Sequence, residues 1–220
     1  MSEVTSRYRY TSAGPSWSNN YLWRPLLKVL TDRLKPGDSI LDVGCGSGAT
    51  AGMLAKRGYQ LVGIDPSESG IALAEEAFPD VRFAQRSAYD DLAGEYGQFD
   101  AIVSLEVVEH CFSPRVYAAN LYSATKPGGI VVISTPYHGY WKNLALALAG
   151  KFDFHFSPLW DGGHIKFWSA KTITSLLKEA GFVDIRIQRI GRIPPLAKSM
   201  LIVAKRHVRK ADEASIGATP

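Results

Sequence analysis

The sequence of 220 residues predicts an α/β fold, a mainly parallel sheet with helices on both faces, followed by an antiparallel hairpin. Short apolar runs alternate with amphipathic helical stretches as far as residue 135. The first of these runs, 40–43, leads into a turn with three closely spaced glycines, as expected where a buried strand meets a helix. Near the C-terminus, 183–188 alternates apolar and polar residues, and the apolar run 200–204 is close enough to pair with it antiparallel.

Local sequence signals place the individual elements. The predicted strands cover 40–43, 60–64, 81–84, 99–104, 130–134, 183–188 and 200–204. The predicted helices cover 25–34, 48–56, 67–78, 113–125 and 169–180. Ser67, Ser113 and Ser169 suit the N-cap position, and Pro114 follows at the first helical position of its helix. Residues 126–129, Lys-Pro-Gly-Gly, predict a turn.

Composition is typical of one globular domain spanning 1–220. Hydrophobic residues make up 46% and charged residues 21%, and the formal net charge is +4. Much of the basic excess lies in Lys205, Arg206, Arg209 and Lys210, which we expect in a solvated end, so nucleic-acid binding is not favoured. Two cysteines without metal or redox spacing, no apolar leader and no run of membrane-spanning length favour a cytoplasmic protein.

Three segments lie outside the alternating pattern. Residues 1–34 form a predicted N-terminal cap, 137–168 an aromatic-rich insertion, and 207–220 a flexible tail. Tyr8, Tyr10, Trp17, Tyr21 and Trp23 in the cap are candidates to cover a site; surface packing is the alternative. The sequence does not define an oligomeric state.

Polar residues gather at the predicted strand ends, where open α/β sheets bind ligands. Asp42 precedes the glycines, and Asp65 follows them at a spacing that suits a ribose diol. The glycine turn also fits a dinucleotide site, but Asp42 would then place negative charge near a pyrophosphate. A cofactor with an amino group and a sulfonium, S-adenosyl-L-methionine, fits Asp42 better.

The order of the segments 40–48, 61–65, 99–110 and 126–134 resembles class I S-adenosylmethionine-dependent methyltransferases, over roughly residues 35–206. The resemblance implies a doubly wound seven-stranded sheet, mostly parallel, with an antiparallel last strand. It implies that these residues bind the cofactor: Asp42, Gly44, Cys45, Gly46, Gly48, Asp65, Pro66, Ser87, Ala88, Leu105 and Glu106. Ser87 and Ala88 stand where that family often has an acidic residue at the adenine, so base recognition is expected to use backbone groups.

The acceptor is predicted from residues after the fourth strand. Ser104-Leu105-Glu106 differs from the Asn-Pro-Pro-Tyr of enzymes that methylate DNA adenine or glutamine. Glu106 to His110 resembles the Glu-x-x-Glu-His segment of ubiquinone-pathway O-methyltransferases, and Gly162-Gly163-His164 is similar to their Gly-Thr-His. The resemblance implies a small, largely apolar, aromatic hydroxyl acceptor, with His110 or His164 as general base. A structural hydrogen-bonding role is the alternative for His164.

Several alternatives stay open. Glu106, Glu109 and His110 are an alternative set of ligands for a divalent metal, but a site without metal is favoured. The apolar segment 140–150 is predicted to be a lid over the acceptor; peripheral membrane contact, which the resemblance suggests, and simple core packing are the other readings. An RNA or protein methyltransferase and a non-catalytic S-adenosylmethionine-binding protein are the alternative functions.

Overall fold

The computed structural model describes residues 9–156, 159 and 163–208. Some predictions concern residues outside these ranges, namely Tyr8, Gly162 and the tail from 209 onward. Within the described ranges, no helix combines the length and apolar character needed to cross a membrane.

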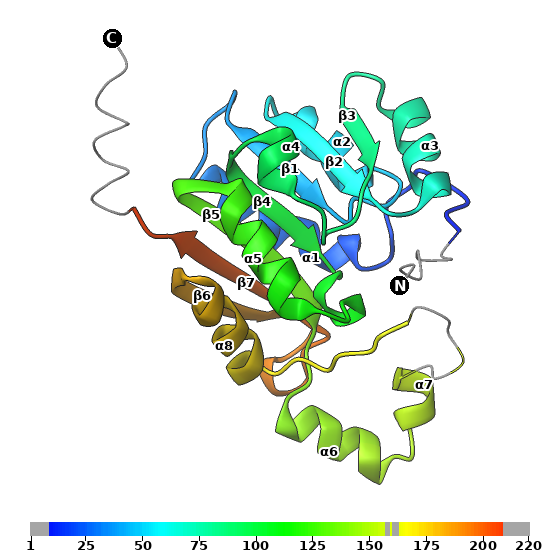
Figure 1. Cartoon of the computed structure of the whole chain (residues 1–220). Helices are drawn as coiled ribbons and strands as arrows, with labels where there is room; N and C mark the ends of the chain where they lie inside the picture. The colour runs from blue at the N-terminus through cyan, green and yellow to red at the C-terminus, as the bar shows by residue number, and fades with distance from the viewer. Residues whose placement is uncertain (1–8, 157–158, 160–162, 209–220) are drawn as a thin grey trace.

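A seven-stranded sheet forms the centre of the molecule, in the order β3-β2-β1-β4-β5-β7-β6 (Figure 1). The strands are β1 (Ser39–Val43), β2 (Gln60–Asp65), β3 (Arg82–Gln85), β4 (Phe99–Leu105), β5 (Thr125–Pro136), β6 (Phe182–Ile190) and β7 (Ser199–Arg206). The first five strands pair parallel, and β7 pairs antiparallel with both β5 and β6. The predicted fold class, including the antiparallel last strand, is confirmed.

Helices cover both faces of the sheet, and the sheet separates two apolar cores. One core contains α1 (Asn19–Thr31), α2 (Ala49–Ala55) and α3 (Glu68–Ala77). The other contains α4 (Leu92–Tyr96), α5 (Pro114–Ala124) and α8 (Ala170–Ala180). Leu22, Leu26 and Leu30 of α1 are fully buried, as the leucine stripe predicts, although α1 begins six residues before the expected Pro25.

One local prediction was wrong, and one short helix was not predicted. Residues 126–129 belong to β5: Thr125 pairs with Phe99, the register then shifts, and Ile130 pairs with Ala101. The positive φ of Gly128, 81°, accommodates this irregularity inside the strand. The short helix α4 was not predicted; Asp91 caps it by accepting a hydrogen bond from the backbone N–H of Gly94.

The basic residues expected in the tail are partly structural. Lys205 and Arg206 lie in β7, and Lys205 pairs with Ile130 of β5. The Arg206 guanidinium donates hydrogen bonds from Nη1 to the carbonyl oxygens of Tyr122, Ser123 and Thr125. Arg206 therefore fastens the end of α5 to β7, which corrects its assignment to a solvated end.

The insertion after β5 forms α6 (Tyr140–Leu148) and α7 (Phe152–Phe156), which project from the sheet (Figure 1). Tyr140, Trp141 and Leu148 are exposed on α6. Lys142 is buried instead, and its ammonium donates to the carbonyl oxygens of Tyr137 and Lys198. The insertion is thus anchored to the ends of β5 and β7 while most of its apolar surface faces outward.

Candidate functional site

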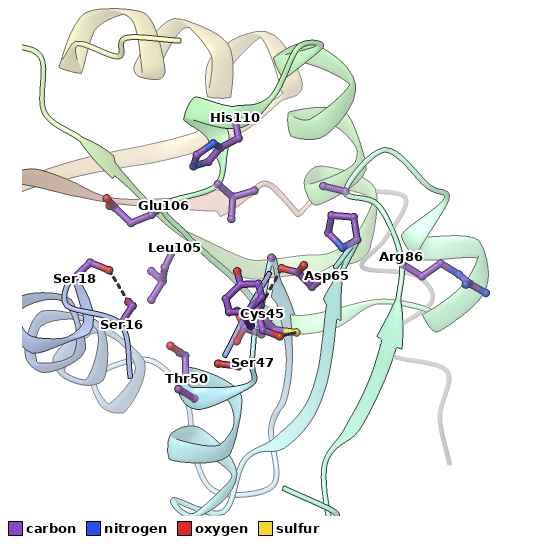
Figure 2. Close-up of a pocket in the computed structure, with 18 of the residues that line it drawn as sticks. Ser16, Ser18, Cys45, Ser47, Thr50, Asp65, Arg86, Leu105, Glu106 and His110 are labelled. Carbon is purple, nitrogen blue, oxygen red and sulfur yellow. Dashed lines mark hydrogen bonds between the residues drawn. The ribbon is translucent and has the colours of Figure 1, made fainter. Parts of the chain in front are cut away.

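A cavity of about 1330 Å³ opens at the carboxyl ends of β1, β2 and β4. Figure 2 shows Asp65 and Cys45 in its interior, Ser16 and Ser18 on one side, and Glu106 and His110 on another. A typical small-molecule pocket has roughly 300–1,000 Å³, so this cavity has room for two ligands side by side.

The glycine turn brings backbone directly to the cavity. Gly44 and Gly46 both have positive φ, 79° and 54°, a conformation that L side chains rarely adopt. Asp65, at the end of β2, accepts hydrogen bonds from the backbone N–H groups of Gly46 at 2.9 Å and Ser67 at 2.8 Å. Burial raises the pKa of Asp65, and these two bonds oppose that rise. The second and first strands are therefore joined at their ends by one carboxylate.

Asp42 is the second buried carboxylate of the cavity and is 2% exposed. Burial, and then the charge of Asp65, raise its pKa to about 7. Its Oδ2 atom has no hydrogen-bond partner among the described residues. A buried acceptor without a partner is energetically unfavourable, so Asp42 is suited to an amino group or another cationic donor of a ligand.

The far end of the cavity is lined by the loop after β3. Ser87 and Ala88 lie there as predicted, together with Asp90. The Asp90 carboxylate accepts a hydrogen bond from the backbone N–H of Ser87 at 2.9 Å. Asp90 was not predicted at this end of the cavity, because it comes three residues after Ser87, the position at which the family often has an acidic residue.

Gly48 differs from the other predicted cofactor residues because it is not among the described residues that line the cavity. It turns the chain into α2 with φ of 78° and faces Ala74 and Phe83. A packing role for Gly48 explains the third glycine of the turn. The other ten predicted residues line the cavity together, whereas their binding of a cofactor stays a prediction.

Glu106 follows β4 in a left-handed conformation, with φ of 56°. Its backbone N–H donates to Ser134 Oγ, and its carboxylate accepts a hydrogen bond from that same hydroxyl at 2.8 Å. The local backbone strain is held by these bonds to β5. Burial raises the pKa of Glu106 to about 7.

His110 and His164 meet at the cavity wall, with ring centroids 5.0 Å apart. His110 Nδ1 lies 3.1 Å from the carbonyl oxygen of Gly163. Because a carbonyl only accepts, this bond requires the proton on Nδ1 and leaves the lone pair on Nε2. The two histidines that the sequence names as alternative bases thus lie side by side in the cavity, and a base role for either stays a prediction.

Glu109 lies behind the histidines and is 1% exposed. Its Oε2 accepts a hydrogen bond from Thr135 at 3.0 Å, and its Oε1 lies 3.9 Å from His164 Nε2. Its carbonyl oxygen accepts from the backbone N–H groups of Ile165 and Lys166, which holds the segment carrying His164 against η1 (Val108–His110). Glu109 was expected from the sequence only in the alternative set of metal ligands, whereas its backbone carbonyl holds the segment that carries His164.

Glu109, His110 and His164 each have one ligand atom within 4.8 Å of the others. This cluster differs from the alternative metal set of the sequence analysis, because His164 takes the place of Glu106. Burial, and then the charge of Glu106, raise the pKa of Glu109 well above its ordinary value. The three residues therefore form a candidate metal-binding group, in which the 3.9 Å between Glu109 Oε1 and His164 Nε2 is too long for a hydrogen bond.

The chain before α1 forms the remaining wall. We call residues 9–18 the strap; its members in the cavity include Tyr10, Ser16 and Ser18. The prediction that N-terminal aromatics cover the site is seen for Tyr10. Trp23 instead donates a hydrogen bond to Thr50, and Tyr21 pairs with Ser199.

A family model described as a methyltransferase domain matches residues 17–187. The chain belongs to the methyltransferase domain family. This match includes the glycine turn, Asp65, Glu106 and both histidines of the cavity. The family predicted from the sequence is confirmed.

Two relatives similar in sequence carry the same name. A ubiquinone biosynthesis O-methyltransferase from Dinoroseobacter shibae is 32% identical over 154 residues, which is 68% of this chain and 61% of that protein. A protein of the same name from Burkholderia pseudomallei is 27% identical, over 83% of each chain. The chain thus spans about three fifths of the first relative and most of the second.

Solved structures share the fold. The magnesium protoporphyrin IX methyltransferase of Synechocystis PCC 6803, solved with bound SAH, gives a TM-score of 0.65 at 20% identity, covering 83% of this chain and 81% of that one. A phosphoethanolamine N-methyltransferase from Haemonchus contortus, in complex with S-adenosyl-L-methionine, gives 0.61 at 18% identity, covering 84% and 53%. At these identities the likeness establishes the sheet and its helices alone.

Proposed function

We propose that this protein is an S-adenosyl-L-methionine-dependent methyltransferase that methylates a hydroxyl group of a small, largely apolar, aromatic acceptor. One observation carries the proposal: a single cavity combines two buried carboxylates beside a glycine turn with a pair of histidines on its wall. The relatives named as ubiquinone biosynthesis O-methyltransferases support oxygen as the methylated atom.

One set of cavity residues is assigned to the cofactor and another to the acceptor. The cofactor supplies an electrophilic methyl group on a positively charged sulfur. Asp42 would bind its amino group, Asp65 its ribose hydroxyls, and the loop at Ser87 its adenine. The buried carboxylates also complement the positive charge of the bound molecule, which a neutral pocket would not do.

The acceptor hydroxyl must lose a proton as its oxygen is methylated. His110 suits this step because its Nδ1 proton is held by the Gly163 carbonyl, which keeps the lone pair on Nε2. His164 Nε2 lies 3.9 Å from Glu109 Oε1, and a proton taken up by His164 would lower the raised pKa of that buried carboxyl and be stabilised by it once ionised. Either histidine can therefore act as the base, and Glu106 closes the site beside them. No metal is assigned to this step.

The test is a labelled-methyl assay with S-adenosylmethionine and a panel of catechols, phenols and other hydroxyl metabolites, beside RNA and protein substrates. Methyl transfer to a phenolic member supports the proposal. Transfer only to RNA or protein refutes the acceptor class. If calorimetry detects binding of neither S-adenosylmethionine nor S-adenosylhomocysteine, the cofactor assignment is wrong.

We further propose that residues 140–150 guard the acceptor entrance as a lid. Their exposed aromatic and leucine side chains support a role in contacting an apolar molecule. None of the described α6 residues lines the cavity, so this lid would have to move toward it when the acceptor binds. Peripheral membrane contact by the same surface is the alternative, and sedimentation with liposomes of neutral and anionic lipid separates the two readings.

We also place the protein in the cytoplasm. Cys45 and Cys111 are both unbonded and buried, as expected for a reducing compartment. Fractionation of cells that produce the full chain tests this placement.

A further inference from the structure

Tyr10 of the strap lies directly on the backbone of two glycines. A Cβ atom added to Gly46 would be 2.7 Å from the Tyr10 hydroxyl oxygen, and one added to Gly70 would be 2.9 Å from its ring. Only residues without a side chain permit this approach. The aromatic ring therefore rests on the glycine turn that borders the cavity.

A chain of hydrogen bonds connects Tyr10 to Asp65. The Tyr10 backbone N–H donates to Ser69 Oγ at 3.2 Å, and Ser69 Oγ lies 3.1 Å from Ser67 Oγ. The Ser67 N–H in turn donates to Asp65 Oδ1. The position of the strap is thus linked to the carboxylate that the proposed function assigns to the ribose.

The strap itself has the character of a segment that opens easily. It contains no helix or strand within residues 9–18, and most of its side chains are exposed. Segments with few buried apolar contacts open at much lower free energy than the core. In contrast, Cys45, Ser47 and Asp65 at the strand ends beneath the strap are buried. The strap is therefore expected to open more easily than the part of the site that it covers.

We propose that the strap closes over the bound cofactor with Tyr10 as its latch, and that its opening controls exchange of S-adenosylmethionine and S-adenosylhomocysteine. This inference rests on the proposed function, because it assigns the cofactor to the floor beneath the strap. Tyr10 is then a cofactor-retaining residue, and Ser69 is the polar anchor of the latch.

The decisive measurement is the dissociation rate of S-adenosylhomocysteine, followed in a stopped-flow chase with excess S-adenosylmethionine. We expect Tyr10→Ala to accelerate dissociation by about tenfold or more, because the ring no longer covers the ligand. Tyr10→Phe keeps the ring and the backbone N–H, so its rate should stay within about twofold of the wild type. Ser69→Ala should accelerate dissociation by a few fold, whereas Ser123→Ala, at the remote end of α5, should leave it unchanged.

Hydrogen exchange of the wild-type protein gives an independent readout. S-adenosylhomocysteine should slow exchange in residues 10–18, while β5 is protected equally with and without it. An unchanged dissociation rate in Tyr10→Ala, or equal exchange in the strap with and without ligand, would overturn the latch. Wild-type protein that binds neither ligand would overturn the proposed function and the latch with it, so the two failures are distinguishable.

Discussion

Replacing Asp42 by Asn should stabilise the ligand-free protein and weaken cofactor binding. The ordinary pKa of this aspartate is 3.8, and in the fold burial and the charge of Asp65 raise it to about 7. The difference is roughly three pH units, which corresponds to about 4 kcal/mol at about 1.4 kcal/mol per unit. The amide side chain of the Asp42→Asn variant carries no charge, and it keeps an oxygen that can accept the backbone hydrogen bond from Ala51.

The direction of the stability change with pH follows from proton binding. The Asp42 carboxyl, whose pKa is raised in the fold, contributes its full stabilisation below pH 4, and this contribution is lost as pH rises to about 7. The Asp42→Asn variant should therefore match the wild type near pH 4 and exceed its stability by up to about 4 kcal/mol at pH 8. For a chain of this length that gain raises the unfolding midpoint by roughly 10 °C.

Thermal and denaturant unfolding of both proteins from pH 4 to pH 8 tests this prediction, with calorimetry of S-adenosylhomocysteine at pH 8. The variant should bind the ligand at least about tenfold more weakly, because the proposed partner of the ligand's amino group is lost. Asp80→Asn, at an exposed position, is the matched control and should change neither quantity. A stability difference that is constant across the pH range would show that the Asp42 charge is not the cause.

Three further perturbations test other parts of the site. His110→Ala and His164→Ala should each be assayed for turnover over a pH series, with His207→Ala as control. We expect turnover to fall by about 10²–10⁴-fold in at least one of the two variants. Intact turnover in both would refute the base assignment. Gly46→Ala should destabilise the fold by about 1–2 kcal/mol and, because its Cβ displaces Tyr10, weaken S-adenosylhomocysteine binding by about tenfold or more. Gly97→Ala, which also has a positive φ but open space around it, should show only the destabilisation. Equal binding by both variants would contradict the close approach of Tyr10 to Gly46. Exhaustive dialysis against EDTA should leave turnover unchanged. Activity that is lost and then restored by a divalent metal would establish a metal requirement, for which Glu109, His110 and His164 are the candidate ligands.

The parallel part of the sheet could be predicted because each strand is a short apolar run ended by polar or turn residues. The same alternation placed Asp42, Asp65 and Glu106 at strand ends, where the structure has them lining one cavity. Turn-forming residues were a less reliable guide where strand pairing determines the local structure. The sequence of 126–129 favours a turn, but Thr125 and Ile130 on either side of it both pair with β4, so the strand continues through it.

Other features depend on contacts between distant segments, which a single sequence does not display. Asp90 lies at the cavity because of its bond to Ser87, and Arg206 is structural because α5 ends beside β7. Similarly, the burial of Glu109 results from the segment 163–168 folding over η1. The aromatic residues of the N-terminus suggested a cover, but only the packing of Tyr10 on Gly46 and Gly70 identifies which of them reaches the site.

The position of β7 between β5 and β6 has a consequence for synthesis of the protein on the ribosome. Strand β5 is complete at Pro136, but its antiparallel partner begins only at Ser199. Until that later segment emerges, the nascent sheet presents the open edge of β5, including the apolar residues Val131, Val132 and Ile133. Unpaired apolar edges are prone to intermolecular association, so this chain has a vulnerable interval that ends when β7 inserts and Arg206 reaches the end of α5.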